Sequence, residues 1–119
     1  MIIDVDETNF ETEVLAASHR TPVLVDFWAE WCPPCRALTP VLERVVRERP
    51  GELRLAKIEA DENMRLAGRY QLRGFPTVLL FVAGAEVARF SSARSETWVR
   101  EFIAANVASP AVASGAIRS

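Results

Sequence analysis

The chain has 119 residues, half of them hydrophobic, which suits a single domain with a core of ordinary size. Its 14 basic and 16 acidic side chains are mixed along the sequence and give a net charge of -2, so no basic face for nucleic acid is expected. No apolar run approaches the roughly 20 residues of a membrane span, and the first residues lack a secretory pattern, so we expect a cytoplasmic protein without membrane contact.

Strand patterns alternate with helical patterns in the first half of the chain, which indicates a layered α/β domain. A brief strand is predicted at residues 2–5, before a helix opened by a capping box of Thr8 and Glu11. Residues 23–28 form a nearly continuous apolar run, which is typical of a central strand covered on both faces. Apolar pairs at helical spacing then predict a helix over 34–49.

The second half continues the alternation and ends in an unpatterned segment. A strand is predicted at 53–58 and a short helix at 61–70. Strands at 77–82 and 86–90 flank a glycine-containing turn, which predicts a hairpin. The apolar stripe of a last helix consists of Trp98, Val99, Phe102 and Ile103.

The last residues, 109–119, are small and follow no pattern, which predicts a flexible C-terminal tail or the beginning of a linker. The folded domain is therefore expected to span residues 1–108. We find no internal repeat.

The only two cysteines, Cys32 and Cys35, lie three residues apart where the predicted central strand ends and a helix begins. Free N–H groups and the positive end of the helix dipole favour a thiolate there. In a reducing compartment such a pair is typical of a catalytic or metal-binding site. Half of a zinc site is the alternative, and it would require a dimer, because structural zinc takes four ligands. We predict a redox-active dithiol and no metal.

The two residues between the cysteines, Pro33 and Pro34, have no N–H group. The backbone N–H and the thiol of Cys35 are therefore the candidate donors to a thiolate on Cys32. We expect Cys32, at the exposed helix start, to attack a substrate disulfide and Cys35 to resolve the mixed disulfide. Because a residue before proline avoids α geometry, the helix is expected to start at Pro34.

Asp26 is the one carboxyl inside the apolar run 23–28. Desolvation in a central strand raises the pKa of a carboxyl and lets it exchange a proton near neutrality. The alternative is a carboxyl at a frayed strand end that binds solvent.

Several motifs together resemble those of the thioredoxin family over roughly the first 108 residues. They are Val-Asp-Phe-Trp-Ala-Glu-Trp-Cys at 25–32, then Pro34 and Cys35, Pro40, Lys57, and Gly-Phe-Pro-Thr at 74–77. The resemblance implies a thioredoxin fold, with a central mixed sheet of about five strands flanked by about four helices. It also implies a protein-disulfide reductase with no bound cofactor beyond the Cys32–Cys35 disulfide. A thioredoxin reductase, an NADPH-dependent flavoprotein, would recharge it, and we expect a monomer.

The resemblance also implies roles for individual residues near the cysteines. Asp26 would serve as acid or base for Cys35, with Lys57 as the partner of its carboxyl; a lysine that snorkels at a sheet edge is the alternative. Phe75–Pro76 would be a cis peptide facing the cysteines, with an extended substrate segment pairing along the backbone of Phe75. A trans proline at the start of an edge strand is the alternative.

Two tryptophans precede the cysteine pair in the sequence. Trp31 is expected to offer exposed aromatic surface to partners, and Trp28 to pack beneath the loop. Ordinary core and surface packing is the alternative for both.

Two departures from the thioredoxin pattern affect what the resemblance implies. Pro33 stands where thioredoxins commonly have glycine, and the direction of its effect on the redox potential stays open. Ser92 and Ala93 belong to a loop where thioredoxins commonly show Gly-Ala, so we expect them to line the substrate groove and the serine to narrow it. A partner-binding or co-chaperone domain with secondary redox activity is the alternative function, and an oxidase or isomerase is a third.

Overall fold

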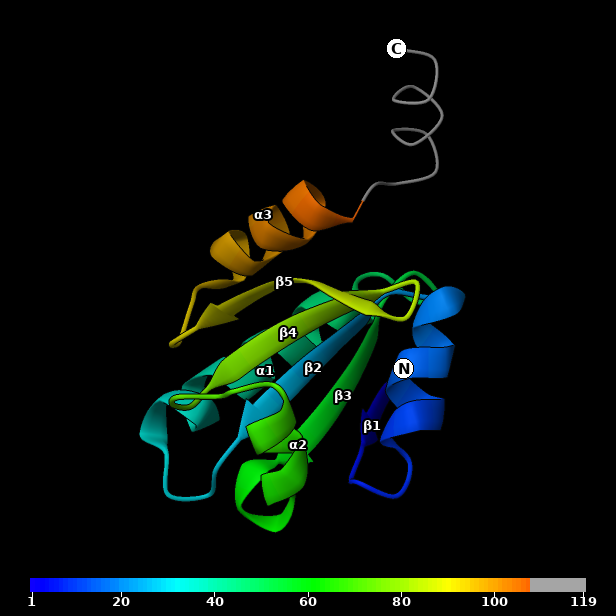
Figure 1. Ribbon diagram of the computed structural model, residues 1–119. Helices are drawn as coiled ribbons and strands as arrows, with labels where there is room; N and C mark the ends of the chain where they lie inside the picture. The colour runs from blue at the N-terminus through cyan, green and yellow to red at the C-terminus, as the bar shows by residue number, and fades with distance from the viewer. Residues whose placement is uncertain (108–119) are drawn as a thin grey trace, which may run out of the picture.

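A five-stranded mixed sheet, in the order β1-β3-β2-β4-β5, forms the centre of the structure (Figure 1). Strands β1 and β2 run parallel to β3, whereas β4 runs antiparallel to β2 and β5. The computed structural model describes residues 1–107, and the tail predicted at 109–119 lies outside the described residues. The strands are β1 (Ile2–Asp4), β2 (Val23–Trp28), β3 (Arg54–Glu59), β4 (Thr77–Val82) and β5 (Ala85–Ser91).

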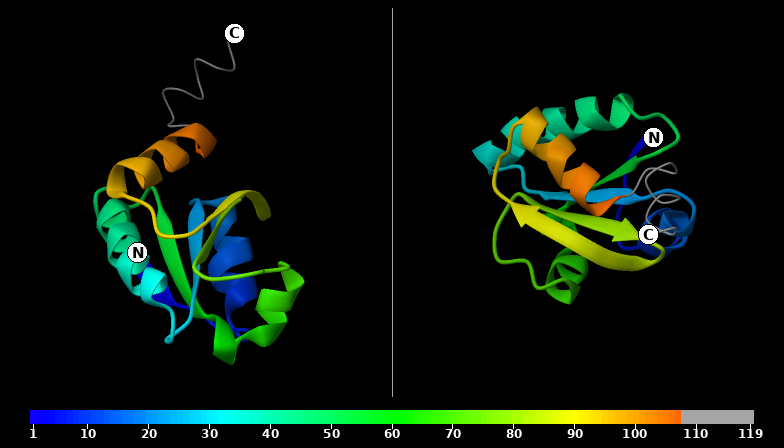
Figure 2. Two further views of the ribbon diagram at one scale, coloured as in Figure 1. Left: turned by 90° about the vertical axis from the view of Figure 1, so that its left-hand side faces the viewer. Right: turned by 90° about the horizontal axis from the view of Figure 1, so that it is seen from above.

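Helices cover both faces of this sheet, as Figure 2 shows from above. One face packs against α1 (Pro33–Arg47) and α3 (Glu96–Asn106) through aliphatic side chains and Phe90. The opposite face packs against η1 (Glu11–Ala16) and α2 (Met64–Arg69). The described residues also form two short 3₁₀ helices, η2 (Ala17–His19) and η3 (Ala60–Glu62). The predicted mixed sheet with flanking helices is confirmed.

Strand β2 is apolar along nearly its whole length because both of its faces are covered. Val23, Val25 and Phe27 belong to the core beneath η1 and α2, whereas Leu24 belongs to the core beneath α1 and α3. Successive side chains of a strand point to opposite faces, so Asp26 shares the α1 face with Leu24. The buried carboxyl therefore lies on the side of the sheet where the cysteine helix packs.

The predicted capping box of Thr8 and Glu11 is wrong. The segment before η1 is instead held by two hydrogen bonds from backbone to side chain: the Thr8 N–H donates to Asp6 Oδ1 and the Asp6 N–H donates to Asn9 Oδ1, each at 2.8 Å. No side chain caps η1, which has π-type geometry. The acceptor that organises this turn is therefore Asp6, two residues before the predicted cap.

Two helix boundaries also differ from prediction. The first turn of α1 begins at Pro33 rather than Pro34, because the first helical position needs no N–H and favours the fixed φ of proline. The helix predicted at 61–70 is divided at Asn63, whose φ of -139° is not helical. The Asn63 amide donates to Glu59 O at 2.8 Å and accepts the Glu7 N–H at 2.9 Å, which stabilises the break.

Among residues 1–107, no helix is both long and apolar enough to cross a membrane.

Candidate active site

The two cysteines lie where the chain leaves β2 and enters α1, and they form a disulfide with a Cα–Cα distance of 5.3 Å. Cys32 is the N-cap of α1, with extended φ and ψ of -106° and 101°. Its Sγ accepts the N–H of Cys35 at 3.3 Å. The backbone donor predicted from the two prolines is therefore present.

The helix start is exposed at Pro33 and Pro34, as expected, but the two cysteines themselves are buried. Cys32 is 2% exposed and Cys35 is 1% exposed, because both pack with Ala29 against Trp28 and Phe75. Trp31, Pro33 and Pro34 beside them are exposed, Trp31 at 64%. The surface next to the sulfur atoms is thus formed by an indole ring and two prolines.

Trp31 and Phe75 form an edge-to-face pair with ring centroids 6.3 Å apart. The indole N–H of Trp31 donates to Asp61 Oδ2 at 2.9 Å, which fixes the ring despite its exposure. Trp28 is partly buried against the cysteines, as expected for a ring beneath the loop. The predicted placement of both tryptophans is confirmed.

The Phe75–Pro76 peptide is cis, as the resemblance implied. The carbonyl oxygen of Phe75 lies 3.4 Å from Cys32 Sγ. Just after the cis bond, the Thr77 hydroxyl donates to Gly74 O at 2.7 Å and closes the turn. The backbone before Pro76 is therefore held directly against the sulfur of Cys32.

The loop after β5 lies against the same proline. The Ser92 N–H donates to Pro76 O at 3.2 Å, and both Ser92 and Ala93 are exposed. Ser92 has a φ of 75°, in the left-handed region that glycine adopts with little strain. The Ser92–Ala93 loop therefore lies beside the cis proline.

Asp26 is completely buried in β2, opposite Lys57 of β3 and Val78 of β4. Strands thus flank it on both sides, which rules out the frayed strand end. Its Oδ2 accepts the hydroxyl of Thr39 at 2.7 Å, whereas its Oδ1 has no hydrogen-bond partner among the described residues. Burial raises the pKa of Asp26 to about 6, although the Thr39 hydrogen bond and the Lys57 charge lower it.

Lys57 does not bind the Asp26 carboxyl directly. Its ammonium donates to Glu43 Oε2 at 3.0 Å, and both side chains are about one quarter exposed. Strand β3 lies between β1 and β2, so a lysine at a sheet edge is also the wrong interpretation. Lys57 acts on Asp26 only through its charge, and the nearby charge of Glu43 opposes it.

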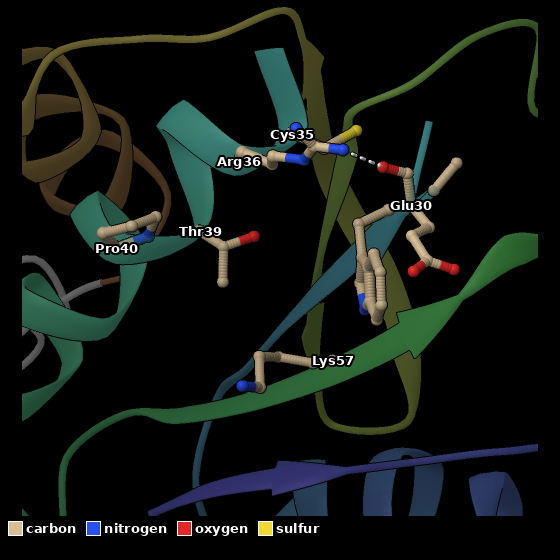
Figure 3. Close-up of a pocket in the computed structure, with 8 residues that line it drawn as sticks. Glu30, Cys35, Arg36, Thr39, Pro40 and Lys57 are labelled. Carbon is tan, nitrogen blue, oxygen red and sulfur yellow. Dashed lines mark hydrogen bonds between the residues drawn. The ribbon is translucent and has the colours of Figure 1, made fainter. Parts of the chain in front are cut away.

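A cavity of about 360 Å³ lies between α1 and the end of β2 (Figure 3). Thr39 of α1 and Lys57 of β3 face this cavity from different elements in Figure 3. Its lining is Trp28, Ala29, Glu30, Cys35, Arg36, Thr39, Pro40 and Lys57. The cavity beside Cys35 thus adjoins the Thr39 hydroxyl that donates to Asp26.

Sequence reasoning missed Thr39 and Glu43. They follow Cys35 at intervals of four residues on α1, a spacing that places all three on one face of a helix. That spacing, together with a buried carboxyl on the facing strand, was the signal that could have found them.

Residues 1–107 contain no group of three or more metal-ligating side chains arranged to hold a metal ion. The one histidine, His19, is remote from the cysteines. Its imidazole lies beside Gly84 in the β4–β5 turn, at the opposite end of β4 from the cis proline. The described site therefore consists of the disulfide and the buried carboxyl.

A cysteine pair closed into a disulfide at the N-terminus of the helix after the central strand, facing a cis proline, defines a thiol-disulfide oxidoreductase. The family described as Thioredoxin matches this chain over residues 1–105. The chain is 42% identical over 106 residues to the thioredoxin of Pseudomonas aeruginosa, covering 89% of this chain and 96% of that protein. It is 45% identical over 102 residues to the thioredoxin of Acidithiobacillus ferridurans, covering 86% and 93%. The chain belongs to the thioredoxin family.

Replacement of Asp26 by Asn should stabilise the protein in a pH-dependent way. A carboxyl with a raised folded pKa contributes stability below its unfolded pKa of about 3.8, and this contribution is lost as the pH rises through about 6. The free energy of unfolding of Asp26→Asn, relative to wild type, should therefore increase by about 3 kcal/mol between about pH 3.5 and about pH 7.5. Urea unfolding across this range measures it; a difference that stays constant with pH contradicts the buried, raised pKa.

Replacement of Ser92 by Gly should stabilise the fold, because the left-handed φ of Ser92 strains a residue with a Cβ atom. Glycine removes that strain but adds freedom to the unfolded chain, so the expected gain is about 0.5 to 1 kcal/mol. Urea unfolding measures the change. The matched control is Ser91→Gly at the end of β5, where the same entropy applies without the strain and stability should fall. Equal losses in both variants would contradict the strained φ at Ser92.

Proposed function

We propose that this protein reduces protein disulfides through a Cys-Pro-Pro-Cys active site in which Cys32 attacks and Cys35 resolves. The observation that carries the proposal is the position of Cys32. It caps the helix that begins at Pro33, it receives the Cys35 N–H, and it is already joined to Cys35 in a disulfide. A helix N-terminus and a direct N–H donor both stabilise a thiolate, so Cys32 is the sulfur favoured to ionise.

The reaction transfers two electrons from the dithiol to the substrate. The Cys32 thiolate attacks one sulfur of the substrate disulfide, a Cys32–substrate bond forms, and the other substrate sulfur leaves as a thiolate. Cys35 then loses its proton and attacks Cys32 Sγ, which breaks the mixed disulfide and releases the second substrate thiolate. Both released thiolates take protons from solvent as their pKa requires. The protein ends as the Cys32–Cys35 disulfide, and two electrons from a partner restore the dithiol.

Asp26 is the base that we assign to Cys35 in the second step. Its carboxyl is buried on the α1 face of β2, and its raised pKa of about 6 lets it gain and lose a proton near neutrality. We assign Lys57 a supporting role, because its charge lowers the pKa of Asp26 and favours the form that accepts a proton.

The proposed substrate groove surrounds Cys32. Phe75 and Pro76 present a backbone edge against the sulfur, along which an extended substrate segment can pair as an added strand. Trp31 offers exposed aromatic surface on one side, and the Ser92–Ala93 loop forms the other side. Pro33 and Pro34 lie between the two cysteines and complete the active-site loop.

The biological setting follows from family membership. We propose protein disulfides as substrates and a thioredoxin reductase, an NADPH-dependent flavoprotein, as the source of electrons. We also propose a monomer in the cytoplasm, with a thioredoxin domain at residues 1–108 and a flexible tail at 109–119. A stable dimer of the reduced protein in size-exclusion chromatography would overturn the monomer.

Replacement of each cysteine by serine should separate the two roles. Cys32→Ser removes the attacking thiolate, so disulfide reduction should fall to the rate without protein. Cys35→Ser keeps the attack but removes the resolving thiol, so mixed disulfides with substrate should accumulate. Mass spectrometry of the protein after incubation with insulin detects the added chain. Mild and equal losses in both variants would contradict the assigned roles.

The redox equilibrium of the cysteine pair distinguishes the proposed reductase from an oxidase, an isomerase or a binding domain. Trp28 and Trp31 lie close enough to the disulfide for their fluorescence to follow its state in glutathione buffers. A reductase requires a pair that becomes reduced only in a strongly reducing buffer. A pair that is reduced in mildly reducing buffer would mean that Pro33 has changed the site, and the reductase function would be rejected.

A further inference from the structure

The two oxygens of the Asp26 carboxyl have different surroundings. Oδ2 accepts the Thr39 hydroxyl at 2.7 Å, and Oδ1 is buried without a hydrogen-bond partner among the described residues. A buried polar oxygen without a partner costs free energy, so its persistence calls for a reason. Thr39 and Cys35 both line the cavity of about 360 Å³ shown in Figure 3.

We propose that Thr39 is a positioning residue for proton transfer, whose hydroxyl holds Asp26 Oδ2 and leaves Oδ1 as the oxygen that takes the proton from Cys35. The proposal rests on the proposed role of Asp26 as the base. A hydroxyl that donates to Oδ2 favours the unprotonated state of that atom, because a proton on Oδ2 would force the hydroxyl to turn away. The proton therefore goes to the oxygen without a partner.

The step is balanced within the site. Cys35 Sγ–H breaks and its proton forms a bond with Asp26 Oδ1, while the Cys35 thiolate attacks Cys32 Sγ. The Cys32–substrate bond breaks, and its electron pair leaves on the substrate sulfur. The proton on Asp26 then returns to solvent before the next turnover, and Thr39 keeps its hydrogen bond to Oδ2 throughout.

The other groups that face Asp26 do not replace Thr39. From β3, the Lys57 ammonium lowers the pKa of Asp26 through its charge but is hydrogen-bonded to Glu43. From α1, the negative charge of Glu43 acts against that of Lys57 and raises the pKa of Asp26. From β4, the residue opposite Asp26 is Val78, which has no titratable group. Thr39 is thus the described side chain that donates a hydrogen bond to this carboxyl.

The test compares Thr39→Val, which keeps the shape and removes the donor, with Thr39→Ser, which keeps the donor. Carbon NMR of the Asp26 carboxyl in each reduced protein gives its pKa directly. Stopped-flow reaction with dithiobis-nitrobenzoate releases one thionitrobenzoate when Cys32 attacks and a second when Cys35 resolves. The rate of the second release as a function of pH reports the proton transfer from Cys35.

In Thr39→Val, the pKa of Asp26 should rise by about one unit, since a hydrogen bond to a charged group is worth about that much. The pH–rate profile of the second release falls on its acid side, and this acid limb should move to higher pH by the same amount. The rate of the second release near pH 6 should fall several-fold, and the rate of the first release should change little. Thr39→Ser should restore both values. Glu43→Gln removes an opposing negative charge, so it should shift the pKa of Asp26 downward and serves as the matched control on α1.

Three outcomes would overturn the proposal. One is a Thr39→Val protein with the wild-type pKa and acid limb, and another is a Thr39→Ser protein that behaves like Thr39→Val. A third is an upward shift in Glu43→Gln, which would indicate a general disturbance of α1. The role of Asp26 itself is tested separately by Asp26→Asn. If the second release still shows the same acid limb in this variant, Asp26 is not the base for Cys35, and that part of the proposed function is rejected.

Discussion

The position of β2 at the centre of the sheet is the constraint on which the site depends. This strand pairs with β3 on one edge and β4 on the other, and helices cover both of its faces. Its end is therefore fixed, and the chain passes from Trp28 directly into the turn that Cys32 closes. Because the same strand also contains Asp26, one rigid element fixes the positions of both the disulfide and the buried carboxyl. The packing of the apolar residues around Asp26 therefore determines the geometry of the site.

The proton affinity of Asp26 results from opposing effects of different size. Burial is the largest and raises its pKa, whereas the Thr39 hydroxyl and the Lys57 charge lower it. Lys57 is less effective than a direct partner, because its ammonium is bound to Glu43 and the two charges act on Asp26 in opposite directions. Desolvation is therefore the dominant effect, and the opposing effects limit the pKa of Asp26 to about 6. A direct ion pair would instead have kept the carboxyl ionised throughout the physiological range.

The sequence was sufficient for the sheet, the order of the elements and the cysteine turn, because each depends on a local or periodic signal. The apolar run of β2 and the Pro33–Pro34 pair are examples. The contacts that sequence reasoning missed depend on side chains distant along the chain. The spacing of Thr39 and Glu43 from Cys35 places them on one face of α1, but it does not show that Thr39 donates to Asp26 or that Glu43 binds Lys57. The burial of Cys32 was missed for the same reason, since Phe75 covers it from another loop.

The two prolines also determine which donor the active-site sulfur can have. An N-cap side chain accepts an N–H from the second or third helical residue, and proline at the second position has none to give. The donor must then be Cys35, which occupies the third position, and it is the donor observed. The helix dipole contributes at most about 2 kcal/mol, or about one and a half pKa units, so any further stabilisation of a Cys32 thiolate depends on such hydrogen bonds. Since proline restricts the unfolded chain as well, Pro33 and Pro34 hold this single donor in place with less loss of conformational entropy than flexible residues would.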